Sequence, residues 1–168
     1  DYEGKKNDSM PFIRSMIKDI ESRYSIDPGR IFACGQSSGG YMTSYLAFAA
    51  SDLFTAVSPW SAYTYPGSNH ELFAYKEDDY FTYGHVPICL MFGDKDNIIG
   101  EDGGNFWQDK TSDVYGFAMF IIETYDLDQE PYIYDCAPVK YYIWRNKKGT
   151  PMLKIGVVSD MPHANYAE

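Results

Sequence analysis

The 168-residue sequence lacks several features that define other classes of protein. No apolar run approaches the roughly 20 residues that a membrane-spanning helix needs, and no signal peptide opens the chain. Lys and Arg number only 14 against 24 Asp and Glu, and they form no cluster that would suit a nucleic acid backbone or an anionic lipid. We therefore expect an acidic protein that binds neither nucleic acid nor membrane.

Cysteine is also scarce, with Cys34, Cys89 and Cys136 and no CxxC pair among them. Cys34 and Cys89 lie inside strand-like apolar runs, where a free thiol usually behaves as a small buried side chain. We expect both to be buried and structural. Cysteine usage therefore does not identify the compartment.

Metal-binding patterns are present only in incomplete form. The acidic loop DKDNIIGED (94–102) is similar to a calcium loop, but Ile98 and Ile99 stand where an oxygen ligand and a glycine are required. A His-Glu pair begins at His70, but Ala74 stands where the HExxH zinc motif needs its second histidine. We expect neither a metal nor another cofactor.

The sequence does contain ample material for a buried core, since 45% of its residues are hydrophobic and 17% are aromatic. Helical spacing and short apolar runs then predict the elements. The helices are expected over 10–24, 40–50 and 113–125, and the strands over 30–34, 54–60, 86–92, 140–145 and 152–159. Strands that alternate with helices and are apolar on both sides indicate an α/β fold, a mostly parallel sheet with helices on both faces.

A glycine-rich turn joins the strand at 30–34 to the following helix. Its residues, Gly35-Gln36-Ser37-Ser38-Gly39, fit the G-x-S-x-G nucleophile elbow, in which a strained turn lifts the serine hydroxyl clear of the sheet. We expect side chains at Gly35 and Gly39 to collide with the adjoining strand and helix. The helix N-terminus beyond Ser37 would stabilise negative charge as it develops.

A serine nucleophile requires a base and a carboxylate, which follow this motif in the order Ser, Asp or Glu, His. Functional groups in such sheets gather beyond the carboxyl ends of the strands. Asp96 follows the strand at 86–92, and His163 follows the strand at 152–159. These positions predict that both residues meet Ser37 at one edge of the sheet.

The other two histidines fit this role less well. His85 precedes its strand and is expected at the opposite edge of the sheet, out of reach of the serine. His70 lies in a long irregular stretch rich in Tyr, Gly, Ser and Asn, and we interpret it as a solvated loop residue. Position alone does not select the acid, because Asp94, Glu101 and Asp102 lie in the same loop as Asp96.

Four segments carry a resemblance to a known family and span most of residues 24–163. They are YSIDPGRIFACGQSSGGYMTSYLA, DLFTAVSPWSA, VPICLMFGDKDNII and YYIWRNKKGTPMLKIGVVSDMPH. The chain resembles the C-terminal portion of an α/β-hydrolase, specifically the polyhydroxybutyrate-depolymerase-like and feruloyl-esterase-like carbohydrate esterases. The family pattern G-x-x-D selects Asp96 after Gly93 in preference to Asp94, and a Pro-His setting selects His163. The resemblance also favours a secreted or periplasmic location.

The beginning of the chain departs from the family pattern. About four strands precede the elbow in an α/β-hydrolase, and a loop after one of them supplies the second oxyanion donor. Here only the Ser38 amide of that oxyanion hole is present, and the chain begins at Asp1 rather than at Met. We expect residues 1–168 to be a partial catalytic domain, inactive in isolation. The strand near Ile31 would be covered by the N-terminal part of the same domain or by a second chain.

The leading functional interpretation is hydrolysis of a carboxylic ester, with Ser37 as nucleophile, His163 as base and Asp96 orienting the imidazole. The resemblance favours feruloyl or acetyl esters, either as small molecules or linked to plant polysaccharides. Two alternatives remain open. GGYMT and GDKD also suit a prolyl-oligopeptidase-type serine peptidase, and the fold could serve as a non-catalytic module.

Overall fold

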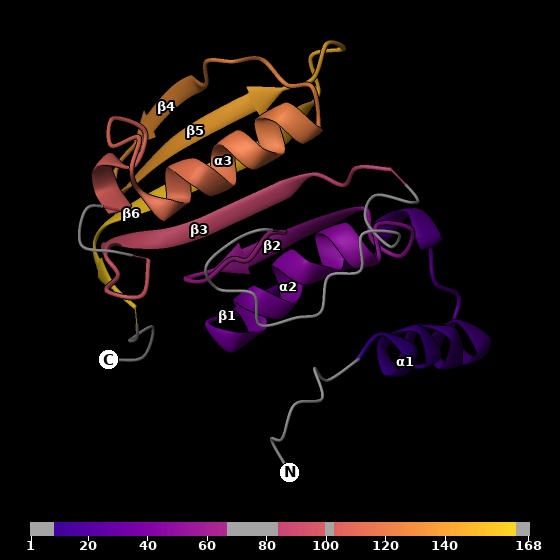
Figure 1. The fold of residues 1–168 in the computed structure, drawn as a ribbon. Helices are drawn as coiled ribbons and strands as arrows, with labels where there is room; N and C mark the ends of the chain where they lie inside the picture. Colours follow the sequence, from indigo (N-terminus) through magenta and orange to yellow (C-terminus); the bar gives the residue numbers. More distant parts are fainter. Residues whose placement is uncertain (1–8, 67–83, 100–102, 164–168) are drawn as a thin grey trace.

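The computed structural model describes residues 9–66, 84–99 and 103–163. At its centre lies a six-stranded sheet with the strand order β1-β2-β3-β6-β5-β4 (Figure 1). The strands are β1 (Phe32–Gln36), β2 (Ala56–Trp60), β3 (Ile88–Lys95), β4 (Tyr132–Cys136), β5 (Val139–Arg145) and β6 (Pro151–Pro162). The helices are α1 (Met10–Arg23), α2 (Ser38–Ala49) and α3 (Asp113–Thr124), with short 3-10 turns η1 (Pro28–Arg30) and η3 (Gly103–Asn105).

The sheet is mostly parallel, as the sequence predicts. β1, β2, β3 and β6 run parallel to one another, and β5 and β4 then continue the sheet in antiparallel fashion. β4 is absent from the sequence-based prediction, although its residues YIYDC are rich in aromatic and β-branched types. Every residue of β4 is exposed, so the strand has no buried face that would give the usual alternation of apolar and polar residues.

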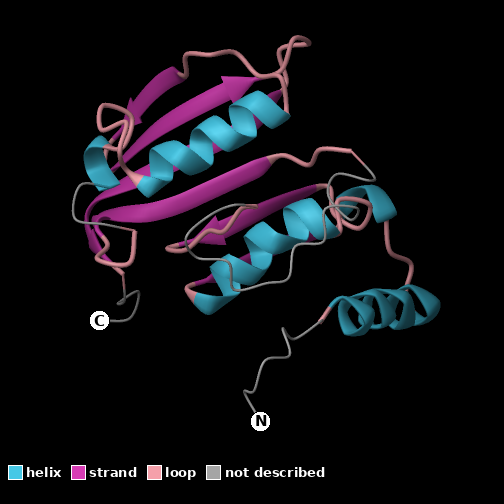
Figure 2. Cartoon of the chain, viewed as in Figure 1, coloured by secondary structure: helices cyan, strands magenta, loops and turns pink. Residues whose placement is uncertain are grey.

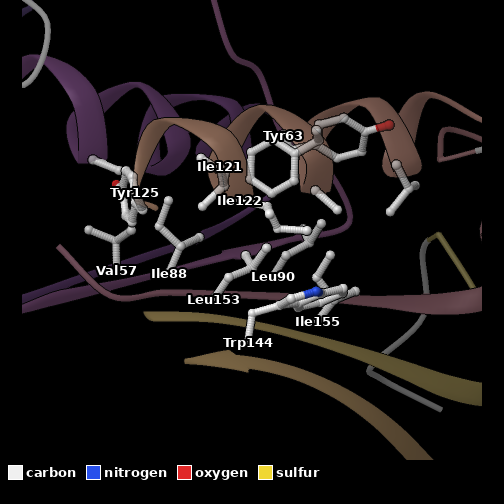
Figure 3. Close-up of a cluster of buried hydrophobic side chains, with 14 of the residues drawn as sticks. Val57, Tyr63, Ile88, Leu90, Ile121, Ile122, Tyr125, Trp144, Leu153 and Ile155 are labelled. Atoms are coloured by element: carbon white, nitrogen blue, oxygen red, sulfur yellow. The ribbon is translucent and has the colours of Figure 1, made fainter. Parts of the chain in front are cut away.

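One face of the sheet carries the hydrophobic core. Alternate residues of the strands point to this face, and helices α2 and α3 both pack on it (Figure 2). Figure 3 shows the central part of the cluster, in which Ile121 and Ile122 of α3 lie over Ile88, Leu90 and Leu153. All five side chains are almost completely buried. Burial of this apolar surface is the main favourable term that holds α3 to the sheet.

The opposite face of the sheet is more open among the described residues. Phe32 is 62% exposed, Cys34 is exposed, and Ser58 and Cys89 on the neighbouring strands are only half-buried. The expectation that Cys34 is buried is therefore wrong, because its strand lies at the edge of the sheet and its side chain points to the face opposite α2. The helices that pack on the sheet within the described residues lie on one face of it.

Helix α1 lies apart from the sheet, beyond the β1 edge (Figure 1). Ile13 and Ile17 pack partly against the core, and Arg14 forms a bidentate ion pair with Asp52, just after α2. None of the residues of α1 is buried, and Phe12 is 71% exposed. The part of the chain that the structure describes contains no helix long and apolar enough to cross a membrane.

Candidate active site

The turn between β1 and α2 has the geometry of a nucleophile elbow. Ser37 has φ 54° and ψ −119°, a strained conformation for a residue with a side chain. A Cβ at Gly35 would lie 2.5 Å from the main-chain oxygen of Gly39, so position 35 requires glycine. At Gly39 a Cβ would meet nothing within 4 Å, which contradicts the expected collision; the crowded position is Gly40, 2.6 Å from the Trp60 oxygen.

Two hydrogen bonds fix this turn in the structure. The Ser37 amide donates to the Trp60 carbonyl at 2.9 Å, which extends the β1–β2 ladder into the elbow. The Tyr41 amide donates to the Ser37 carbonyl at 3.1 Å and begins the hydrogen bonding of α2. Ser38 is the first residue of that helix, where backbone N–H groups have no partner within the helix itself. The hydroxyl of Ser37 is thus set at the positive end of α2.

His163 is brought to this place by an irregular end of β6. The pairing of β3 with β6 is regular up to Gly93 and then shifts, so that Lys95 pairs with Pro162. Gly93 makes the shift possible, because a Cβ there would overlap the main-chain oxygen of Met161. Lys95 and Asp160 hold the two strand ends together by an ion pair of 2.6 Å. The glycine of the G-x-x-D pattern therefore gives β6 room to cross the end of β3.

Ser37, His163 and Asp96 form a continuous hydrogen-bonded chain. The Oγ of Ser37 lies 3.0 Å from Nε2 of His163, and Nδ1 of the same ring lies 2.8 Å from Oδ1 of Asp96. An ionised carboxylate only accepts hydrogen bonds, so Nδ1 carries a proton and donates a hydrogen bond to Asp96. In the neutral ring Nε2 is then an acceptor, and the hydroxyl of Ser37 donates to it.

Asp96 is held rigidly at the end of β3. Its side chain is completely buried, and its Oδ1 accepts hydrogen bonds from the amides of Ile98 at 3.0 Å and Ile99 at 3.3 Å. These two bonds form a tight turn around the carboxylate and fix its orientation. Ile98 and Ile99, which break the calcium-loop pattern, thus supply the main-chain donors. Among the residues that the structure describes, no group has the composition of a metal site.

The neighbouring residues lie as follows. Asp94 makes no hydrogen bond to His163, and its Oδ1 is buried without a hydrogen-bond partner. His85 precedes β3 and stacks on Tyr125 with the ring centroids 4.1 Å apart, so it is not part of the hydrogen-bonded chain. Its pKa is lowered by burial. His70, Glu101 and Asp102 lie outside the described residues.

Two nearby residues were missed by the sequence analysis. Tyr41 lies in the first turn of α2, and the pKa of its phenol is raised by burial and further by the negative charge of Asp96. Gln36 donates a hydrogen bond from Nε2 to the main-chain oxygen of His163 at 3.1 Å. Gln36 is the first variable position of the G-x-S-x-G motif, and that pattern gives no signal for a contact with a residue so distant in the sequence.

Comparison with solved structures identifies the fold. The acetyl xylan esterase from Aspergillus awamori superposes with a TM-score of 0.62 at 14% sequence identity, over 91% of this chain and 61% of that one. Esterase PE8 superposes with a TM-score of 0.54 at 13% identity, over 98% of this chain and 60% of that one. The chain has the mostly parallel sheet of the α/β-hydrolase fold that these esterases share.

Comparison with curated proteins adds two relatives. The chain is 33% identical to feruloyl esterase B of Piromyces equi over 97 residues, which is 58% of this chain and 17% of that protein. It is 23% identical to poly(3-hydroxyalkanoate) depolymerase C of Paucimonas lemoignei over 90% of this chain and 39% of that protein. The chain therefore spans well under half the length of these relatives. No family model matches the sequence.

Proposed function

We propose that the protein is a serine carboxylic-ester hydrolase in which Ser37, His163 and Asp96 form the catalytic triad. Ser37 Oγ attacks the acyl carbonyl while its proton passes to Nε2 of His163. The imidazolium then gives this proton to the leaving alcohol. In the second half, water loses a proton to Nε2 and attacks the acyl-serine carbonyl. The bond to Ser37 Oγ then breaks, the imidazolium returns the proton to Oγ, and the carboxylic acid leaves.

The observation that carries this proposal is the unbroken chain of hydrogen bonds that ends at a strained serine. Ser37 Oγ is 3.0 Å from Nε2 of His163, and Nδ1 of His163 is 2.8 Å from Oδ1 of Asp96. Buried Asp96 stabilises the imidazolium that forms when the serine loses its proton. The Ser38 amide at the start of α2 would donate to the oxyanion of the tetrahedral intermediate.

The relatives guide the choice of substrate. Feruloyl esterase B and the acetyl xylan esterase are named for feruloyl and acetyl esters, and the depolymerase is named for a polyester. We propose feruloyl or acetyl esters, free or linked to plant polysaccharide, as substrates of this protein. These names favour the esterase over the peptidase, and a peptide p-nitroanilide with proline before the scissile bond tests that alternative directly.

The experiment measures hydrolysis of p-nitrophenyl acetate and methyl ferulate by the 168-residue chain and by the full product of its gene. Ser37→Ala is the matched variant, since it removes one oxygen atom and leaves the fold unchanged. Hydrolysis that the serine variant abolishes supports the proposal. Equal hydrolysis by the parent and by Ser37→Ala contradicts it. Cleavage of the peptide substrate alone would establish the peptidase. If the full gene product cleaves none of these substrates, the non-catalytic module is the better description.

A further inference from the structure

Gln36 connects the nucleophile elbow to the main chain of His163. It is the last residue of β1 and directly precedes Ser37. Its side chain points to the open face of the sheet, and its Nε2 donates to the carbonyl oxygen of His163 at 3.1 Å. The two residues are 127 positions apart in the sequence, and β2 and β3 lie between their strands in the sheet.

The contact gives His163 a third fixed atom. Ser37 contacts Nε2 of the ring, Asp96 contacts Nδ1, and Gln36 contacts the main-chain oxygen. Two consecutive residues of the elbow therefore hold the ring and the backbone of the same histidine. The distance between Nε2 and Oγ depends on where the backbone of His163 lies, as well as on its side-chain rotamer.

Contacts from β3 fix the end of β6 just before His163. The pairing of Lys95 with Pro162 and the ion pair of Lys95 with Asp160 both hold the end of β6 to β3. These contacts act on Asp160 and Pro162, which precede His163 in the chain. Gln36 is the residue of the elbow that bonds the main chain of His163 itself, and a loss of this bond would let Nε2 move away from Oγ.

We propose that Gln36 is a positioning residue that keeps His163 in register with Ser37 by donating a hydrogen bond to its carbonyl oxygen. The inference rests on the proposed ester hydrolysis. The role needs a donor at the end of a side chain of this length, which the glutamine amide provides. A carboxylate of the same size would only accept hydrogen bonds and would face the carbonyl oxygen with like charge.

The test compares Gln36→Met and Gln36→Glu with the parent protein, using the full gene product. Methionine keeps the length of the side chain without a donor, and glutamate keeps its shape. The two variants share the loss of the donor. Because a misplaced base slows the chemical step, kcat should fall about tenfold in Gln36→Met, with KM within about twofold. The kcat of Gln36→Glu should fall at least as far, and the negative charge of the glutamate should move the acidic limb of the pH–activity profile to higher pH.

Cys34→Ala is the matched control. Cys34 lies two residues earlier on the same strand, on the same face, and is likewise exposed, and no hydrogen bond from it to His163 is seen. This variant should retain the parent kcat. In the 168-residue chain the midpoints of thermal unfolding should agree among all four proteins, because there the bond of Gln36 is exposed to solvent and contributes little to global stability.

A second readout does not depend on turnover. The proton between Nδ1 of His163 and Asp96 can be followed by proton NMR, and its resonance should broaden or disappear in Gln36→Met and persist in Cys34→Ala. A parent protein that hydrolyses no ester contradicts the proposed function, and the NMR comparison then decides the role of Gln36 alone. Parent-like kcat in Gln36→Met together with an unchanged resonance would overturn the inference. A lower kcat in Gln36→Met would also overturn the inference if the variant unfolded at a clearly lower temperature than the parent, because the loss would then reflect general destabilisation.

Discussion

Two neighbouring tyrosines of β5 show how the two faces of the sheet differ. Tyr142 is fully buried and packs edge-on against Phe106, with the ring centroids 4.8 Å apart. Tyr141 points to the other face, where it is half-buried beneath the ammonium group of Lys154 at 3.8 Å and stacks on Tyr134. The residue type is the same, so the contrast arises from what covers each face.

The candidate site lies at the edge of the sheet, beyond the carboxyl ends of the strands. Ser37, Asp96 and His163 all follow the carboxyl ends of strands, and none of them, not even buried Asp96, belongs to the hydrophobic cluster. They are positioned by turns and hydrogen bonds rather than by core packing. The comparison therefore predicts that stability and chemistry can be altered separately.

The largest expected effect is on chemistry at the edge of the sheet. In the full gene product, Ser37→Ala should lower the kcat for p-nitrophenyl acetate by about 10⁴-fold or more, because no nucleophile remains. The free energy of unfolding should change little, since the serine hydroxyl bonds only to His163 among the described contacts. Steady-state kinetics and urea unfolding provide the two measurements. A variant that unfolds at a much lower urea concentration would show that the site and the core are not separate.

The next largest effect is on stability, and it differs between the two faces of the sheet. Tyr142→Ala should destabilise the protein by about 3–5 kcal/mol, because it leaves a cavity among buried aromatic rings. Tyr141→Ala should cost about 1 kcal/mol, since it removes a half-buried ring and its contact with Lys154. Urea unfolding of both variants is the measurement. Equal losses would show that something outside the described residues covers the second face as well.

The difference between the faces also limits what the sequence could predict. Apolar residues on both sides of the predicted strands at 30–34 and 86–92 indicated burial on both faces, but Cys34 is exposed. Sequence pattern reports how apolar a side chain is, and burial depends on which element packs against it. The exposed strand β4 was missed for a related reason: neither of its faces is buried, so its sequence shows no alternation of apolar and polar residues.

The residues of the candidate site were more predictable than their surroundings. Parallel strands place their carboxyl ends together, so the order of strands was enough to bring Ser37, Asp96 and His163 to one edge. The sequence could not show the shift between β3 and β6 or the bond from Gln36, because both depend on side-chain and backbone positions between distant segments. The choice of Asp96 over Asp94 came from a family pattern, and in the structure Asp96 is the residue that contacts His163.

A third experiment uses the thiols of the open face. Cys34 is exposed, whereas Cys89 is half-buried and burial raises the pKa of its thiol. In a Cys136→Ser background, Ellman's reagent should therefore modify Cys34 on the order of tenfold faster than Cys89 in the dilute 168-residue chain. Mass spectrometry of partly labelled protein separates the two sites. Faster reaction at Cys89 would contradict the greater exposure of Cys34 on this face.

The same measurement tests the prediction that the strand near Ile31 is covered. β1 pairs only with β2 among the described strands. Protection of Cys34 that grows with protein concentration would indicate a second chain at this edge. Protection that persists at any dilution of the full gene product would indicate a segment of the same protein. Rapid labelling of the full product at every concentration, together with a monomeric mass, would show that the prediction is wrong.

The smallest effect concerns helix α1, which is held by Arg14 and Asp52. The hydrogen bond from Arg14 lowers the pKa of Asp52, and the positive charge of the guanidinium contributes in the same direction. A carboxyl group whose pKa is lower in the folded state stabilises the fold above its unfolded pKa, and this contribution disappears as the pH falls through the folded pKa. The stability of the parent should therefore fall more steeply than that of Asp52→Asn as the pH drops below about 4. Both partners are partly exposed, so the difference at pH 7 should be at most about 1 kcal/mol.

Asp19→Asn is the control, because Asp19 pairs with Arg23 within α1 alone and does not join the helix to the rest of the protein. Hydrogen exchange of the α1 amides, compared at pH 7 and pH 3, would locate the effect: the Asp52 variant should exchange faster than the parent at pH 7, and this difference should be smaller at pH 3. Equal exchange at pH 7 in the parent and the Asp52 variant would show that the packing of Ile13 and Ile17 alone holds this helix.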